Sequence, residues 1–260
     1  MLTLSLSLTL ILIALIAVSN FVVGNVCDSA HYVNSIILKL QHSNYGCMIG
    51  SQFLGCIIYV DDLVLLCPSI CGLKKMLDIC VDEFAGLKLK LNVKKSCILH
   101  FGVRFMHNNK GLTVDGDVIE FVDKAKYLGV MLKVGKNFGV DLQYMKSNFY
   151  CSFNNSVFHP VARFQNELVV LQLVTTFCQP YLLYCMECFD LSVTKLRSTE
   201  HTWLCAVSHI FHVTGSDVKL VSDFTAKMQF GDLLLSRRLK FLNGLTLSDN
   251  AVLDFLTFIH

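Results

Sequence analysis

Charged residues are scarce in this chain, and acidic residues are nearly absent from its first part. Asp, Glu, Lys and Arg make up 16% of the 260 residues, against 53% hydrophobic residues, which is apolar for a soluble protein. Residues 1–26 carry no charge, and Asp28 is the only acid before Asp61. Any site that needs a carboxylate from the N-terminal part of the chain therefore has only Asp28 available.

Several common site patterns are missing as well. No Gly-rich phosphate loop and no Ser-His-Asp arrangement stands out, so the sequence predicts neither a P-loop nucleotidase nor a serine hydrolase. The net charge of +2 is mild for a nucleic-acid binder. Locally, however, residues 73–110 hold eight Lys and Arg against three acids. This excess suits contacts with phosphate, and a solvated face is the alternative.

Tyr59-Val60-Asp61-Asp62 is the most informative segment present. Apolar runs at 53–58 and 63–66 flank it, which predicts a β-hairpin with two adjacent carboxylates at its tip. Paired like charges resist burial unless a cation compensates them. Hard divalent metal ions that prefer oxygen ligands, Mg²⁺ or Mn²⁺, are the cations best suited to neutralise two adjacent carboxylates.

The acidic hairpin and the segments around it resemble the reverse transcriptases of LINE-type (non-LTR) retrotransposons. The pattern of an apolar strand, then Tyr-x-Asp-Asp, then a second apolar strand is similar to motif C of that family. Further segments of the chain are similar to other parts of the family and follow in the same order. They are 32–40 (end of the motif B helix), 72–78 with 86–96 (the following helix and motif D), 126–130 (primer-grip region) and 177–184 (the domain beyond). The resemblance runs from about residue 31 to the C-terminus.

The resemblance implies an RNA-directed DNA polymerase, a nucleotidyltransferase with RNA template and DNA primer as partners. Asp61 would be the direct Mg²⁺ or Mn²⁺ ligand, Asp62 the supporting carboxylate, and Lys95 would lie near the incoming nucleotide. The substrate and primer region would include Tyr59, Tyr127, Leu128 and Gly129. No small-molecule cofactor is expected, and the family is intracellular, in nucleus or cytoplasm.

Two parts of the family's site are missing from the sequence: the motif A strand with its aspartate, and the Arg-Gln-Gly start of motif B. A two-metal site uses carboxylates from both strands to hold ions about 3.5–4 Å apart. Successive strand residues point to opposite faces, so Asp61 and Asp62 cannot both aim at one metal pair. With the fingers also absent, we expect poor metal binding and no polymerase activity from this chain alone.

The expected fold class is α+β: a partial polymerase palm, with helices packed on an antiparallel sheet, followed by an α-helical thumb-like region. The expected divisions are 1–28, 29–135 and 136–260. The apolar spacing from Leu73 to Phe84 predicts a helix ended by Gly86, and Asp115-Gly116 predicts a hairpin turn. Strands are expected at 87–93, 96–101 and 127–132. Helices are expected at 140–158, 161–176, 179–186, 192–212 and 230–243.

The uncharged N-terminal segment predicts a hydrophobic helix. Residues 2–10 alternate Leu with Ser or Thr, and 11–18 are continuously apolar, a length that suits a signal peptide or membrane span. Three interpretations stay open: a signal or anchor that engages a membrane through residues 2–23, a helix packed on the palm, or unselected sequence joined to a transposon remnant. The first would place the protein in a membrane or the secretory route.

Twelve cysteines are scattered through apolar segments, which favours a reducing compartment over a disulfide framework. Cys185, Cys188, His201 and Cys205 nevertheless have zinc-finger-like spacing. The alternative is that Cys185 belongs to a buried helix. Two other functions therefore stay open beside the polymerase fragment: a membrane-anchored or secreted interaction protein that uses the palm as scaffold, and a zinc-stabilised binding module.

Overall fold

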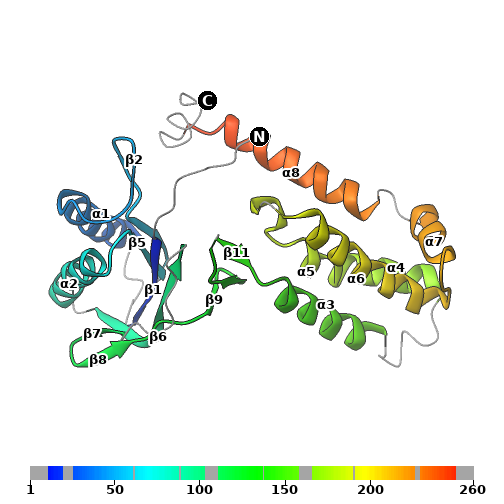
Figure 1. The fold of residues 1–260 in the computed structure, drawn as a ribbon, viewed down its shortest axis with the longest axis horizontal. Coiled ribbons are helices and arrows are strands. Elements are labelled where there is room, and N and C mark those ends of the chain that lie inside the picture. Colours follow the sequence, from blue (N-terminus) through cyan, green and yellow to red (C-terminus); the bar gives the residue numbers. More distant parts are fainter. Residues whose placement is uncertain are drawn as a thin grey trace. The chain divides into compact units, whose positions relative to one another are not determined.

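The structure is a computed structural model of the chain. It describes residues 11–19, 26–60, 62–87, 89–102, 111–136, 138–157, 166–189, 191–225 and 229–249. These residues form a mixed α+β fold with antiparallel sheets, which confirms the fold class at that level. They divide into two compact units (Figure 1). The first runs to residue 127 and includes 132–139, and the second comprises 128–131 and 140–249.

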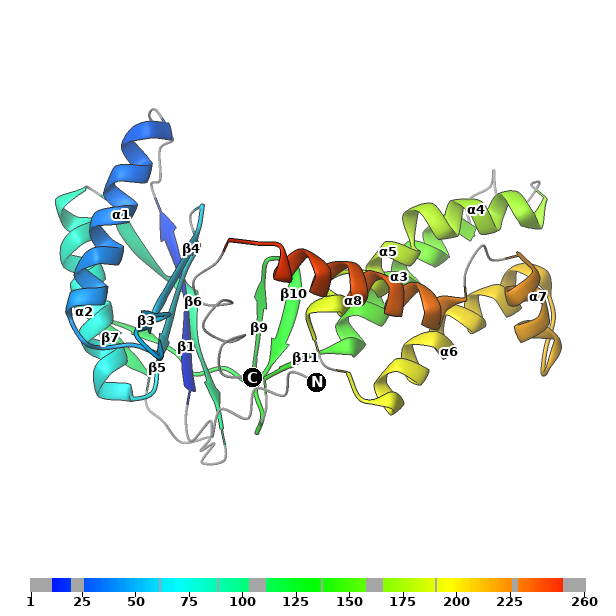
Figure 2. The ribbon, with the colours of Figure 1, turned by 90° about the horizontal axis from the view of Figure 1, so that it is seen from above.

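A four-stranded antiparallel sheet forms the centre of the first unit. Its strands stand in the order β4-β5-β1-β6 and are β1 (Ile11–Ser19), β4 (Cys56–Tyr59), β5 (Asp62–Cys67) and β6 (Lys90–Phe101). Helix α1 (Val26–His42) follows β1, and α2 (Ile70–Gly86) joins β5 to β6. Both helices lie on one side of the sheet (Figure 2). The sequence β-α-β-β-α-β with this strand order is the split βαβ topology.

The core of the first unit lies between these helices and the sheet. The predicted stripe on α2 is confirmed, because Leu73, Met76, Leu77, Cys80 and Phe84 are all buried in it. The side chain of Ser69 caps the helix by accepting a hydrogen bond from the Gly72 amide at 3.1 Å. Gly86 still belongs to the helix, which Leu87 caps, so the helix extends one residue beyond the predicted end.

The N-terminal segment is not a helix where the structure describes it. Residues 11–19 form β1, which pairs with β5 on one side and β6 on the other, and Ile13 to Ile16 are buried. The expected hydrophobic N-terminal helix is therefore wrong for this stretch. A short apolar run suits a strand covered on both faces as well as a buried helix, so periodicity alone does not separate the two. Residues 2–10 and 20–23 of the expected membrane segment lie outside the described residues.

Among the described residues, no single helix has both the length and the apolar character needed to cross a membrane. The consecutive helical segments Glu167–Phe177 and Gln179–Cys188 meet both criteria only when taken together, and they are bent by 43°.

Small hairpins complete the β structure. Strands β2 (Met48–Ile49) and β3 (Gln52–Phe53) form one of them. The predicted Asp115-Gly116 turn is confirmed between β7 (Leu112–Val114) and β8 (Asp117–Ile119). A further sheet has the order β11-β10-β9, formed by β9 (Lys124–Tyr127), β10 (Val130–Lys133) and β11 (Gly139–Val140). The expected continuous strand at 127–132 is wrong, because Leu128 and Gly129 turn the chain with φ of 43° and 83°.

The second unit is helical. Its elements are α3 (Leu142–Val157), α4 (Glu167–Phe177), α5 (Gln179–Leu183), the 3₁₀ helix η2 (Met186–Cys188), α6 (Val193–Phe211), α7 (Asp217–Thr225) and α8 (Phe230–Thr246). Phe149, Val174, Leu182 and Trp203 lie among its buried residues. The predicted helices are confirmed with shifted ends, except that 179–186 breaks at Tyr184 and Cys185. Helix α7 was not predicted, because its nine residues bury only Val218 and Ser222.

Candidate functional site

The acidic hairpin forms as predicted. Strands β4 and β5 are antiparallel, and Tyr59 pairs with Asp62 across a two-residue connection. Val60 has φ of 54°, a left-handed conformation that a β-branched residue rarely adopts. Asp61, the expected direct metal ligand, lies outside the described residues. Tyr59, at the end of β4, is 57% exposed.

The strand β1 lies beside the hairpin. In the register of β1 with β5, Ala17 is the partner of Asp62 and Leu15 the partner of Val64. Directly paired residues of antiparallel strands lie on the same face of a sheet, so position 17 shares a face with Asp62. None of the nine residues of β1, Ile11–Ser19, is acidic. The neighbouring strand is therefore present, but it supplies no second carboxylate.

Lys95 reaches the site from a β-bulge in β6. The pairing of β1 with β6 shifts between Leu15, opposite Cys97, and Ala17, opposite Asn92. Asn92 holds the bulge, since its side-chain Oδ1 accepts from the Lys95 amide at 3.2 Å and its carbonyl accepts from Ser96 Oγ at 2.8 Å. A bulge changes the direction of a side chain relative to the regular strand. It also joins the two strands expected at 87–93 and 96–101 into one.

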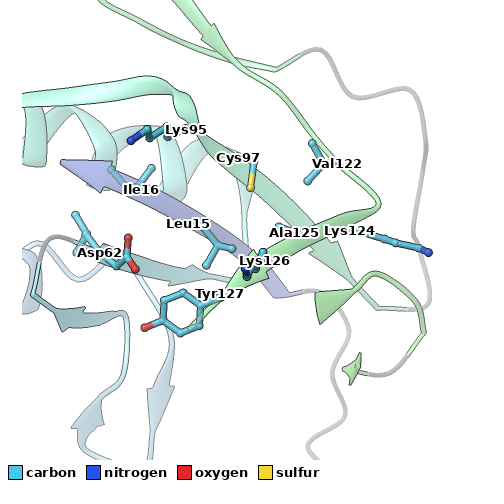
Figure 3. Close-up of a pocket in the computed structure, with 11 residues that line it drawn as sticks. Leu15, Ile16, Asp62, Lys95, Cys97, Val122, Lys124, Ala125, Lys126 and Tyr127 are labelled. Carbon is cyan, nitrogen blue, oxygen red and sulfur yellow. The ribbon is translucent and has the colours of Figure 1, made fainter. Parts of the chain in front are cut away.

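Asp62, Lys95 and Tyr127 line one pocket of about 210 Å³ in the first unit (Figure 3). Residues of β1, β5, β6 and the segment that leads into and forms β9 line it. Its lining residues are Leu15, Ile16, Asp62, Leu63, Lys95, Cys97, Val122, Lys124, Ala125, Lys126 and Tyr127. Three residues that the sequence predicted separately thus meet at one place.

Asp62 and Tyr127 interact electrostatically in this pocket. Burial, and to a smaller degree the negative charge of Asp62, raise the pKa of Tyr127. The phenol is therefore held in its neutral form, in which its hydroxyl can donate a hydrogen bond.

The pocket has the charge of an anion site more than of a metal site. Lys95, Lys124 and Lys126 line it together with a single described carboxylate, Asp62. Within the described residues, no group of three or more His, Cys, Asp or Glu side chains is arranged to hold a metal ion. The described side chains therefore do not fit a pair of divalent metals, which need several carboxylate ligands. The lysines give the lining a net positive charge, which favours a phosphate-bearing ligand, although the amine of Lys124 points away from the other lining residues (Figure 3).

Lys124 and Lys126 were missed as site residues, although 126–130 was singled out by resemblance. Their alternation with Ala125 is a signal for one face of a strand, but the sequence does not show which strand they lie against. Leu128 and Gly129 do not line the pocket, and they belong to the second unit. There the Tyr184 hydroxyl donates to the Leu128 carbonyl at 2.8 Å.

The four residues with zinc-like spacing are not brought together. Cys185 and Cys188 contact each other across η2. His201 and Cys205 form a second pair one turn apart on α6, with Cys205 Sγ 3.6 Å from His201 Nδ1. All four are among the described residues, and no three of them form a metal-binding group.

Comparison of the chain with models of protein families finds no matching family, and comparison with curated proteins finds no match. The observations that bear on its function are therefore the order of the motifs in the sequence and the geometry around Asp62.

Proposed function

We propose that the chain derives from the reverse transcriptase of a LINE-type (non-LTR) retrotransposon, with an incomplete catalytic site in a polymerase palm. The observation that carries this proposal is one juxtaposition. The acidic hairpin lies beside the central strand of a split βαβ sheet, and Asp62, Lys95 and Tyr127 line the same pocket. The helical second unit would correspond to the thumb of such an enzyme.

Catalysis in an intact relative would need two metal ions that stabilise the attacking and leaving oxygens at the nucleotide α-phosphate. In this chain, position 17 offers an alanine where a second carboxylate would face Asp62. We infer that the chain does not join nucleotides by itself. Its own contribution is electrostatic: Lys95 and Lys126 attract a phosphate backbone, and Asp62 limits how closely that backbone approaches the hairpin.

A primer-extension assay tests the lack of activity. With an RNA template, a DNA primer and either Mg²⁺ or Mn²⁺, we expect no added nucleotides. Extension that disappears in Asp61→Ala would show a working site and overturn the inference of an incomplete one. Extension that persists in that variant would identify a contaminating polymerase.

Binding of an RNA–DNA hybrid tests the proposed ligand. Lys126→Gln and Lys95→Gln should each weaken binding similarly for all sequences and lower the salt slope, log K against log salt, by about one. Lys75→Gln is the matched control, because Lys75 lies on α2, which packs on the other face of the sheet and places the ammonium over the Tyr45 ring. Equal losses in Lys75→Gln and Lys126→Gln would mean that the pocket is not the binding surface.

A further inference from the structure

Cys185 and Cys188 form a pair of thiols in a tight turn of the second unit. Cys185 precedes η2 with a left-handed φ of 58°, and Cys188 ends that helix. The Cys188 amide donates to the Cys185 carbonyl at 3.1 Å, and the two side chains are hydrogen-bonded to each other. A turn of this kind keeps its first and last α-carbons within about 7 Å. That separation overlaps the range that a disulfide spans, about 4.4–6.8 Å.

The turn is fixed in place by α8 of the same unit. Glu187 accepts a hydrogen bond from Arg237 Nη2 at 2.8 Å, and Arg238 Nη1 donates to the Phe189 carbonyl at 3.0 Å. Met186, between the two cysteines, is buried. The thiols are therefore held in contact by the surrounding structure, so that joining them costs little further conformational entropy.

The two thiols differ in access. Cys188 is exposed, and Cys185 is partly buried. An external reagent therefore meets Cys188 first and leaves Cys185 as the neighbouring thiol. Partial burial and the adjacent Cys185 raise the pKa of Cys188 to about 11, so that only a small fraction of Cys188 is thiolate at neutral pH and exchange is faster in alkaline solution.

We propose that Cys185 and Cys188 are a site of reversible thiol–disulfide exchange with small disulfides of the glutathione class. The Cys188 thiolate attacks one sulfur of the small disulfide, which forms a mixed disulfide and releases one thiolate that takes up the proton of Cys188. The Cys185 thiolate then attacks Cys188 Sγ, which breaks the mixed disulfide and releases the second small thiol with the proton of Cys185. Two protein thiols lose two electrons, and the small disulfide gains them.

This pair is distinct from another close pair in the chain. Cys56 on β4 and Cys80 on α2 are electrostatic neighbours in the core of the first unit, where Cys80 is fully buried. Burial raises the pKa of Cys56 to about 12 and denies reagents access to Cys80. Cys56 and Cys80 are therefore the internal control: two thiols that lie close together but that a reagent in solution does not reach.

The test uses the full chain, reduced and then exposed to oxidised glutathione, followed by alkylation, digestion and mass spectrometry. We expect the peptide with Cys185 and Cys188 to lose two hydrogens, to regain them with dithiothreitol, and to react at least about tenfold faster than Cys56 and Cys80. Cys185→Ser should trap glutathione on Cys188, whereas Cys188→Ser should abolish the reaction at this turn. Circular dichroism should show both variants folded.

Three results would overturn the proposal: both thiols of the wild-type chain remain alkylatable, glutathione stays on Cys188 without forming the internal disulfide, or Cys56 and Cys80 oxidise equally fast. If the variants fail to fold, the wild-type peptide masses alone decide between these outcomes.

Discussion

Asp62 and Tyr127 offer a direct measurement of the site at the scale of single residues. The charge of Asp62 contributes to the raised pKa of Tyr127, because a nearby carboxylate opposes formation of the tyrosinate. Asp62→Asn should therefore lower the pKa of Tyr127 towards its ordinary value, without removing the larger effect of burial. Ultraviolet titration of tyrosinate measures this change, and a difference titration against Tyr127→Phe assigns it.

Tyr150 serves as the control for that titration. Its pKa is also raised, mainly by burial and then by Cys205, and no contribution comes from Asp62. Asp62→Asn should leave the titration of Tyr150 unchanged. If Asp62→Asn left Tyr127 unchanged as well, the two residues would not share the pocket as described.

The residues that line the pocket differ in how well they could be predicted from the sequence alone. Asp62 and Lys95 were named by the family resemblance, which rests on Tyr-x-Asp-Asp followed by the helix at 72–78 and by Lys94-Lys95. Lys124 and Lys126 were missed, because they reach the pocket only through contacts between β9 and strands far away in sequence. Tyr127 was named by resemblance, but nothing in its own surroundings in the chain indicated a carboxylate beside it.

At the scale of a single helix, replacing either of two glycines of α2 by alanine should change the stability of the protein in opposite directions. A Cβ at position 72 would lie 2.7 Å from Cys67 Sγ and 2.9 Å from Oγ of the capping Ser69. Gly72→Ala should therefore destabilise the protein by about 1–3 kcal/mol through crowding. A Cβ at position 86 would meet nothing within 4 Å. Gly86→Ala should stabilise the protein by about 0.5–1 kcal/mol, because alanine loses less backbone entropy in a helix.

Urea denaturation followed by circular dichroism measures both variants of α2. Each is the control for the other, since they remove the same kind of residue from the two ends of one helix. A stabilising Gly72→Ala would show that the contacts with Cys67 and Ser69 relax at no cost. A destabilising Gly86→Ala would mean that the glycine does end the helix, as the sequence first indicated.

The pairing of β1 with β5 yields a gain-of-function prediction. Ala17 is the register partner of Asp62, so Ala17→Asp places two carboxylates on adjacent strands of one sheet face. Paired carboxylates attract a divalent cation. We expect the dissociation constant for Mn²⁺, measured by electron paramagnetic resonance, to fall about tenfold, which corresponds to about 1.4 kcal/mol. Ala17→Asn, which adds a similar volume without charge, should leave it unchanged.

The double variant Ala17→Asp/Asp62→Asn separates this effect from a general increase in negative charge. It has the same number of acids as the wild-type chain and should bind Mn²⁺ no more tightly. Tighter binding in the double variant would contradict the register of β1 and β5 as the source of the site.

Elements with local signals were predictable, and elements fixed by distant pairing were not. The stripe on α2 repeats every three or four residues, so it identifies both the helix and its buried face. The continuous apolar run of β1 has no such period, and its partners lie far along the chain, as in the pairs Ala17 with Asp62 and Ile11 with Phe101. The hydrophobic segment was therefore expected to be a helix, whereas its residues 11–19 form an inner strand of the sheet, between β5 and β6.

The division of the whole molecule follows from the same long-range pairing. The sequence predicted boundaries after 28, where the uncharged segment ends, and after 135, where Gly135-Lys136-Asn137-Phe138-Gly139 indicates a linker. In the structure, β1 belongs to the first unit, and residues 128–131 and 132–139 fall into different units. Each unit has a buried core of its own, which includes Leu77 in the first and Phe149 in the second.

The single tryptophan allows the stability of the two units to be measured separately. Trp203 is 5% exposed in the second unit and stacks on Phe230 with ring centroids 6.2 Å apart. Its fluorescence therefore reports unfolding of the second unit, whereas circular dichroism follows both. Phe149→Ala should lower the stability seen by tryptophan fluorescence by about 3–5 kcal/mol, because it leaves a cavity beside Phe153.

Leu77→Ala is the matched change in the other unit, since Leu77 is also fully buried. It should destabilise the first unit by about 2–5 kcal/mol and shift the circular dichroism transition, while the tryptophan transition keeps its midpoint. This separation is expected because Leu77 is buried in the core of the first unit and Phe149 is buried in the second unit. If Leu77→Ala moved the tryptophan midpoint as far as Phe149→Ala does, the two units would unfold as one cooperative body.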